Sequence, residues 1–292
     1  MNRLEHWRRV GKTFSWNGYR IFYREGGRGE ALLLLHGFPT ASWDWHKLWP
    51  ALEERFHVVA PDFPGFGFSD KPRGYDYAIS RQADMVEELI GCLGIQGFHI
   101  LAHDYGDTVG QELLARHNGR EGGFGAGLSV RSLCLLNGGL FPEAHAPRLV
   151  QHLMASPIGR LLTPFLSKRT LTRNFNAIFG PETPPTQEEI GEFWSLISYN
   201  QGKAVMHRLI RYMAERRLNR ERWVGALQQA DIPLRLVDGA ADPISGRHLV
   251  EHFRKLIPGP DVVLLESIGH YPQTEAPEQV LRHFLEFTEG AA

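Results

Sequence analysis

The sequence predicts an α/β fold in which a mainly parallel, eight-stranded sheet carries a large helical insertion. Along the 292 residues, short apolar runs alternate with helical patterns, and this alternation is typical of β-α-β crossovers. Residues 141–232 interrupt the alternation, because they contain helical patterns and prolines but no convincing strand. In open α/β sheets ligands bind at the carboxyl edge of the strands, so we expect the insertion to lie over that edge as a lid.

The predicted elements begin with a hairpin. Residues 12–25, KTFSWNGYRIFYRE, form two alternating runs joined by Asn17-Gly18, a pair that supplies the positive φ values of a type I′ turn. A helix is predicted over residues 80–93, where apolar residues repeat at helical spacing and Gly94 follows as a stop. Six further apolar runs have the composition of strands buried on both faces: residues 31–36, 57–60, 98–102, 132–136, 234–238 and 262–266.

Composition and charge exclude several classes of protein. Hydrophobic residues make up 42% and charged residues 22%, which excludes a disordered chain, and the net charge of -1 gives no support for a nucleic-acid or membrane partner. The longest apolar run is too short to cross a bilayer and no signal peptide is visible, so we expect a cytoplasmic protein. Cys92 and Cys134 lie in apolar segments and are expected to be buried free thiols. Nothing in the sequence indicates the oligomeric state.

The strongest local signal is the segment FHILAHDYGDTVGQELLAR, residues 98–116. Here a strand runs into a helix, expected over 105–117, through Asp104. The small residues Ala102 and Gly106 stand two positions before and two after it, as at a nucleophile elbow. The usual G-x-S-x-G pattern occurs nowhere, so the projecting side chain is a carboxylate. Aspartate is also a common helix N-cap, and this segment alone leaves that simpler role open.

Residues that follow three other strands favour the elbow. Asp242 follows the strand at 234–238 and His270 follows the strand at 262–266, so the chain order is nucleophile, acid, histidine. This is the order of the α/β-hydrolase triad. The turn after the strand at 31–36 contains Phe38, whose backbone N–H is expected to form an oxyanion hole with the N–H of Tyr105.

With these motifs the sequence resembles the α/β-hydrolase superfamily, on the aspartate-nucleophile branch that includes epoxide hydrolases and haloalkane dehalogenases. The resemblance spans about residues 12–288, and within the branch it is nearest to the mesoderm-specific transcript family and its bacterial relatives. We expect a core domain of residues 1–141 and 229–292 and a helical cap of residues 142–228. The stretches that carry the likeness are HGFPTASWDW, GFGFSDKP, AHDYGDTVGQELL, SLCLLNGG, FPEAH and RERWVGAL.

The resemblance implies a two-step hydrolysis that needs no cofactor. Asp104 would attack an electrophilic carbon to form an alkyl-enzyme ester, and His270, oriented by Asp242, would activate the water that cleaves it. Aromatic residues of the cap favour a small hydrophobic substrate. The aromatic Phe38 in the His-Gly-x-Pro turn favours an epoxide hydrolase-like reaction. A haloalkane dehalogenase-like or esterase-like hydrolase, and a catalytically silent binding protein on the same fold, remain alternatives.

Epoxide hydrolases of this branch use two cap tyrosines to protonate the epoxide oxygen. The candidates here are Tyr199 and Tyr212, and Tyr212 lies at the edge of an apolar helical stripe. Phe175 and Phe179 occupy the segment in which the first of the two would be expected. An ordinary core tyrosine is the alternative for Tyr212.

Three other features have plain interpretations. His99 and His103 would be adjacent on a helix but are expected on a strand, so no metal site is predicted. GGFGAG at 122–127 is interpreted as a surface loop, because it does not join a strand to a helix as a dinucleotide-binding motif does. Six arginines crowd the end of the cap: Arg208, Arg211, Arg216, Arg217, Arg220 and Arg222. A site for an anionic ligand is one interpretation of them, but interleaved glutamates favour a solvated helix face.

Overall fold

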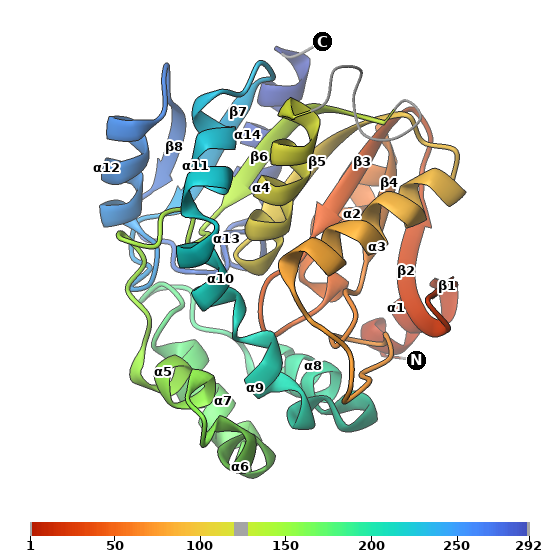
Figure 1. The fold of residues 1–292 in the computed structure, drawn as a ribbon, viewed down its shortest axis with the longest axis vertical. Coiled ribbons are helices and arrows are strands. Elements are labelled where there is room, and N and C mark those ends of the chain that lie inside the picture. Colours follow the sequence, from red (N-terminus) through yellow and green to blue (C-terminus); the bar gives the residue numbers. More distant parts are fainter. Residues whose placement is uncertain (1, 120–127, 291–292) are drawn as a thin grey trace.

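The computed structural model describes residues 2–119 and 128–290, and it contains the predicted eight-stranded, mainly parallel sheet. The strand order is β1-β2-β4-β3-β5-β6-β7-β8 (Figure 1). Strand β2 is antiparallel to both of its neighbours, and every other neighbouring pair is parallel. The strands are β1 (Lys12–Trp16), β2 (Tyr19–Gly26), β3 (Glu30–Leu35), β4 (Phe56–Pro61), β5 (Gly97–His103), β6 (Ser129–Leu136), β7 (Leu234–Gly239) and β8 (Asp261–Leu265).

The N-terminal hairpin forms as its turn sequence predicts. Asn17 has a φ of 47° and Gly18 a φ of 81°, the left-handed values that a type I′ turn requires at both central positions. The turn sets the register in which Trp16 pairs with Tyr19. Strand β2 then pairs with β4, which attaches the hairpin to the parallel strands.

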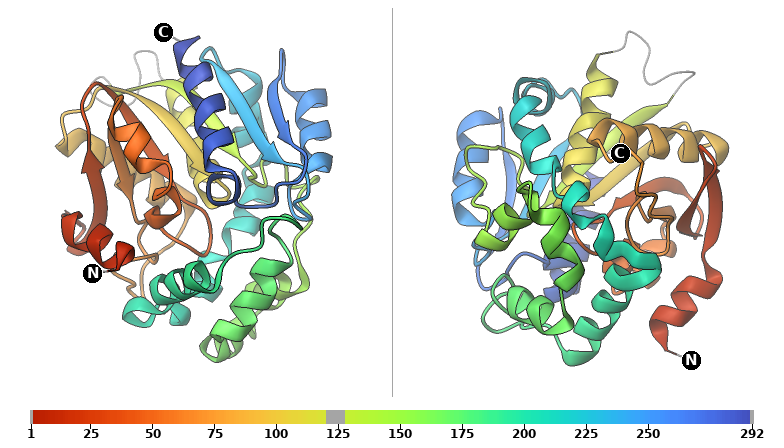
Figure 2. Two further views of the ribbon diagram at one scale, coloured as in Figure 1. Left: turned by 180° about the vertical axis from the view of Figure 1, so that it is seen from behind. Right: turned by 60° about the horizontal axis from the view of Figure 1, so that its bottom comes forward.

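Helices cover both faces of the sheet. Figure 1 shows α3 (Ile79–Cys92), α4 (Tyr105–Asn118) and α11 (Arg220–Gln228) on the near face. The reverse view in Figure 2 shows α2 (Trp49–Glu53) and α14 (Pro277–Glu289) on the other face. Because apolar runs such as residues 31–35 are buried throughout, the core lies on both sides of the sheet. The remaining helices outside the insertion are α1 (Arg3–Val10), α12 (Arg247–Leu256), α13 (Pro272–Glu275) and the 3-10 helix η1 (Ser42–Trp45).

The segment between β6 and β7 contains no strand within its described residues 137–233, as expected, and it lies across the carboxyl edge of the sheet (Figures 1 and 2). Its last helix, α11, packs along α4 beside the sheet instead of over the edge. We therefore propose a cap that begins near residue 142 and ends near Leu218, short of residue 228. The cap helices are α5 (Leu149–Ala155), α6 (Gly159–Leu162), η2 (Thr163–Phe165), α7 (Lys168–Asn176), α8 (Gln187–Ser198), η3 (Tyr199–Ala204), α9 (Met206–Leu209) and α10 (Tyr212–Leu218).

The two cysteines differ in exposure. Cys134 is buried as expected, but Cys92 is exposed because it lies on the outer side of the last turn of α3. The loop predicted at 122–127 lies outside the described residues. Within the described residues no helix has the length and apolarity that crossing a bilayer requires.

Gly106 lets α4 approach β3 closely, and this contact supports a stability prediction. A Cβ at Gly106 would lie 2.2 Å from the carbonyl oxygen of Leu35, which cannot move without shifting the strand. We expect Gly106→Ala to lower the free energy of unfolding by about 3 kcal/mol in chemical denaturation. In the control Gly110→Ala, on the same helix, the new Cβ would meet the end of the Leu133 side chain at 3.3 Å and the Cβ of Ala102 at 3.9 Å, and no backbone atom is as close as at Gly106. That variant should stay within about 1 kcal/mol of the wild type. Equal losses in the two variants would contradict this account of α4.

Candidate active site

Asp104 projects from a strained turn between β5 and α4. Its φ of 45° and ψ of -99° are values that non-glycine residues rarely adopt, and such strain is concentrated at functional sites. The side chain is buried, and its Oδ2 accepts a hydrogen bond of 3.1 Å from the N–H of Phe38, one of the two donors expected there. Tyr105 begins α4, where an N–H has no acceptor within the helix. Its part in an oxyanion hole stays a prediction.

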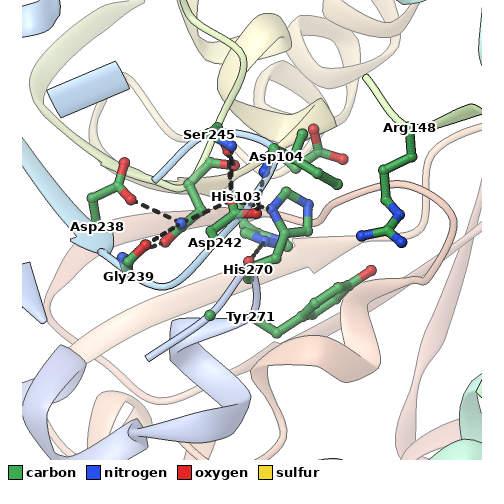
Figure 3. Close-up of polar contacts among 12 residues, drawn as sticks. His103, Asp104, Arg148, Asp238, Gly239, Asp242, Ser245, His270 and Tyr271 are labelled. Atoms are coloured by element: carbon green, nitrogen blue, oxygen red, sulfur yellow. Dashed lines mark hydrogen bonds and ion pairs between the residues drawn. The ribbon is translucent and has the colours of Figure 1, made fainter. Parts of the chain in front are cut away.

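The structure brings Asp242 and His270 into direct contact beside Asp104 (Figure 3). Asp242 follows β7 and His270 follows β8, and the Nδ1 of His270 lies 2.7 Å from the Oδ2 of Asp242. A neutral imidazole that donates from Nδ1 carries its free lone pair on Nε2. His270 and Asp104 line the same cavity, so a base and a carboxylate are available to one bound molecule.

Hydrogen bonds around Asp242 hold it ionised. Burial alone would raise the pKa of Asp242, but the adjacent His270 and several donors lower that pKa to about 2. The donors include the N–H of Ile244 at 2.8 Å and the Oγ of Ser245 at 2.8 Å. Burial would lower the pKa of His270, but the adjacent carboxylate of Asp242 outweighs burial and raises that pKa above its ordinary value.

Asn137 links the loops after β6 and β7, and sequence reasoning did not single it out. Its φ is 42°, and its Nδ2 donates to Asp242 at 3.1 Å and to the Oδ1 of Asp238 at 2.8 Å. Its Oδ1 accepts from the N–H of Gly239 at 2.7 Å. The available signal was an asparagine directly after a buried strand, at the edge where the other site residues gather.

Arg216 is the main correction to the sequence analysis, which placed it on a solvated helix face. It is 2% exposed, and its Nη2 donates to the carbonyl oxygen of Asp104 at 2.9 Å and lies 3.4 Å from the Oδ1 of Asp104. Its Nε donates to the Oγ1 of Thr108 at 2.8 Å. Burial would raise the pKa of Asp104, but nearby groups, of which Arg216 has the largest effect, lower that pKa below its ordinary value. The candidate nucleophile is therefore ionised at neutral pH.

Comparison with known proteins identifies the family. The alpha/beta hydrolase fold family matches residues 30–277 of the chain. The mesoderm-specific transcript protein of Mus musculus is 43% identical over 297 residues, which cover 97% of this chain and 87% of that protein. The chain belongs to the α/β-hydrolase family. The likeness on which the sequence analysis relied is confirmed by these two comparisons.

Solved structures show the same fold. The epoxide hydrolase CorEH aligns with this α/β-hydrolase at a TM-score of 0.77, with 23% identity, over 97% of this chain and 99% of that one. The haloalkane dehalogenase DatA from Agrobacterium tumefaciens aligns at a TM-score of 0.80, with 20% identity, over 97% of both chains. At these identities the likeness establishes the fold and not the reaction.

A small cavity of about 90 Å³ lies between the core and the cap of this α/β-hydrolase. Asp104, His270 and Phe38 line it from the core. Arg148 is the one other charged side chain on its wall among the described residues, and Figure 3 shows it beside Asp104. Most of the cap side of the cavity is apolar, and includes Met154, Leu166, Leu171, Phe175, Ile178, Trp194, Ile197 and Met206.

The two candidate tyrosines have different positions. Tyr212 is buried, and its Oη lies 3.4 Å from the Oδ1 of Asp104, on the side of the carboxylate opposite the Phe38 amide. Tyr199 is not part of the site, because its Oη accepts a hydrogen bond from Arg8 at 2.9 Å and its ring packs against Phe68. It follows the helix that carries the cavity-lining Ile197, but its own side chain packs against the core domain and is not among the residues that line the cavity.

The two histidines of β5 have structural partners. The Nε2 of His103 donates to the carbonyl oxygen of His270 at 2.7 Å, which anchors the loop that carries the candidate base. Burial is the main effect that lowers the pKa of His103 to about 4, so the imidazole of His103 stays neutral. His99 lies 2.8 Å from the Oγ of Ser132. Across residues 2–119 and 128–290, no cluster of three or more histidine, cysteine or acidic side chains is placed to hold a metal ion.

Proposed function

We propose that this α/β-hydrolase opens a small hydrophobic electrophile, an epoxide in first place, through a covalent ester on Asp104. The observation that supports this proposal most is the ionised, buried carboxylate of Asp104 on a strained turn. It lines one cavity together with His270, which is hydrogen-bonded to Asp242. A carboxylate suits attack on a saturated carbon, because it needs no deprotonation and water can later cleave its ester.

The hydrogen bonds support different roles for the two oxygens of Asp104. Oδ2 is held by the N–H of Phe38, whereas Oδ1 lies below the hydroxyl of Tyr212. Oδ1 therefore attacks the substrate carbon while the carbon–oxygen bond of the epoxide breaks. The departing oxygen takes a proton from Tyr212, and Oδ2 becomes the carbonyl oxygen of the ester.

The second step uses the other half of the site. The Nε2 of His270 removes a proton from a water molecule as that water attacks the Cγ of Asp104. Negative charge develops on Oδ2, where the N–H groups of Phe38 and Tyr105 stabilise it. The Cγ–Oδ1 bond then breaks as Oδ1 takes the proton back from His270, and the product leaves as an alcohol. The second proton of the water restores the hydroxyl of Tyr212, so Asp104 returns to a carboxylate that keeps one oxygen from water. Asp242 keeps His270 oriented and balances its charge.

The position of Tyr212 favours an epoxide over a halide, and a substitution tests this. Burial is the main cause of the raised pKa of Tyr212, so its hydroxyl keeps the proton that an opening epoxide needs. We expect Tyr212→Phe to slow single-turnover alkylation by epoxides by about 10²-fold or more. Alkylation by haloalkanes should change little, since a halide leaves without a proton. A matched control is Tyr199→Phe, which alters a tyrosine outside the cavity and should leave both rates unchanged. Equal slowing of both substrate classes would contradict the role of Tyr212.

A catalytically silent binding protein is the rival from another functional class. Such a protein has no need for an ionised carboxylate next to a hydrogen-bonded aspartate–histidine pair. Asp104, Asp242 and His270 have this arrangement here. A screen of epoxides, haloalkanes and esters decides between the two, with Asp104→Asn and His270→Ala as controls. Turnover that is lost in both variants supports the proposal. Esterase activity that survives Asp104→Asn would favour direct attack of water activated by His270.

A further inference from the structure

We propose that the tip of the cap docks on the surface of an anionic phospholipid bilayer. The tip carries a group of exposed apolar side chains that nothing in the described protein covers. Six of the eight large hydrophobic side chains recorded as exposed lie within residues 149–165, and Phe165 is 84%, Leu149 75% and Leu161 68% exposed. We call these six the lid patch: Leu149, Leu153, Ile158, Leu161, Leu162 and Phe165.

The lid patch is a continuous part of the fold. Five of its residues lie on α5, α6 and η2, and Ile158 lies in the turn between α5 and α6. Helices α5 and α6 are at the bottom of Figure 1. The left view of Figure 2 shows the same helices at an end of the molecule away from the sheet. Exposed apolar side chains gathered in this way mark an interaction surface, whereas the same residues scattered singly would need no explanation.

The charge around the lid patch selects an anionic partner. Residues 144–181 contain five arginines and lysines and no aspartate or glutamate. One of the five, Arg148, lines the active-site cavity. The other four are exposed, and no ion pair is recorded for any of them within the described residues: Arg160, Lys168, Arg169 and Arg173. The overall charge of -1 conceals this local excess.

A basic cleft adjoins the lid patch and has the chemistry of a phosphate contact. The cleft has a volume of about 610 Å³. Arg160 and Pro164, which are next to lid patch residues in the sequence, line one side of it. Its other cationic side chains are Arg73, Arg208 and Arg211, and no aspartate or glutamate is among its lining residues. Burial first, and then the nearby arginines, lower the pKa of His207 on the same wall, as expected where positive charge is not balanced.

An anionic bilayer fits both features better than a second copy of the chain. Apolar side chains rimmed by cations insert at the boundary between headgroups and acyl chains, while the cations contact the phosphates. In a symmetric dimer through the same face, the cations of one copy would meet those of the other. On the opposite side of α5, Val150 and Met154 line the active-site cavity, so a docked cap would bring that cavity near the lipid.

Sedimentation with sucrose-loaded vesicles tests this proposal without any turnover, so its failure is distinct from failure of the proposed reaction. The wild type should bind phosphatidylcholine vesicles that contain phosphatidylserine about tenfold more tightly than vesicles of phosphatidylcholine alone. The double variant Leu161→Ser, Phe165→Ser should lose about tenfold or more in binding to both. The double variant Arg160→Glu, Arg169→Glu should lose the preference for phosphatidylserine.

Matched controls lie elsewhere on the surface. Leu218→Ser changes a side chain that is 83% exposed outside the lid patch, and Arg254→Glu with Lys255→Glu reverses two charges on α12. Both controls should bind vesicles as the wild type does. Wild-type protein that fails to bind the anionic vesicles, or patch variants that bind them unchanged, would overturn the proposal. A wild-type dimer that Phe165→Ser dissociates, without any vesicle binding, would assign the lid patch to a second copy instead.

Discussion

Replacing His270 with alanine should stop the reaction after one alkylation of Asp104. The first step needs the ionised carboxylate and not the imidazole, so the alkyl ester should form at close to the wild-type rate. Its hydrolysis should slow by about 10³- to 10⁴-fold, because the described residues that line the cavity include no second histidine to replace Nε2. Intact-protein mass spectrometry should find one equivalent of substrate on the variant, and peptide mapping should find it on Asp104. Asp104→Asn is the control, and it should carry no adduct.

The pH dependence of the same step gives an independent check in the wild type. Since the pKa of His270 is raised above 6.5, the neutral base becomes more abundant as the pH increases through that higher value. Release of the product should therefore accelerate from pH 6 upward and then level off. Asp242→Asn removes the foremost cause of the raised pKa, so the rise should move to lower pH while the maximum rate falls. A His270→Ala variant with normal multiple turnover would contradict this account.

Replacing Arg216 with methionine should change both the stability and the pH profile. The variant removes the cation that pairs with Asp104 and the donor to Thr108 in a fully buried position. Leaving one partner of a buried pair alone costs about 3–5 kcal/mol, which thermal and chemical unfolding should detect at neutral pH. Burial would then act on Asp104 unopposed by Arg216, so the pKa of Asp104 should rise.

The rise in that pKa gives a readout that a purely structural role would not produce. Alkylation should be independent of pH in the wild type down to acidic values, because Asp104 stays ionised. In Arg216→Met the alkylation rate should increase with pH, and Arg216→Lys should restore part of the wild-type profile. Arg217→Met is the control on the neighbouring, exposed residue of the same helix. An unchanged pH profile in Arg216→Met would contradict the role of Arg216 in lowering the pKa of Asp104.

Most of the sheet and the positions of the three candidate catalytic side chains were predictable from the sequence. Apolar runs such as residues 31–35 and 98–102 are strong signals, because strands buried on both faces have near-continuous apolar sequences. The one polar side chain in these two runs, His99, is buried and hydrogen-bonded to Ser132. Parallel strands place their carboxyl ends at one edge, so Asp104, Asp242 and His270 could be brought together without coordinates. The hairpin turn was equally clear, since Asn-Gly has few other uses between alternating runs.

The cap was harder to predict, because short helices do not reveal which face they turn to the core. Arg216 lies one turn after Tyr212, so the two share a buried face, but the neighbouring glutamates suggested a solvated one. Tyr199 was a reasonable candidate by residue type, but it stands at the end of α8, directly before a left-handed kink at Asn200 and Gln201 that the sequence did not reveal. Net charge also averages over the chain, which hid the basic surface around the lid patch.

The measurement that tests the central claim most directly is one turnover in ¹⁸O-labelled water. If Oδ1 of Asp104 forms the ester, the oxygen that the substrate gains comes from the carboxylate, and water replaces it on Asp104. The peptide that contains Asp104 should therefore carry the label after one turnover, and the product of that turnover should be unlabelled. Label in the product and none in the peptide would show direct attack by water, and it would contradict an aspartyl ester even though the fold is that of an α/β-hydrolase.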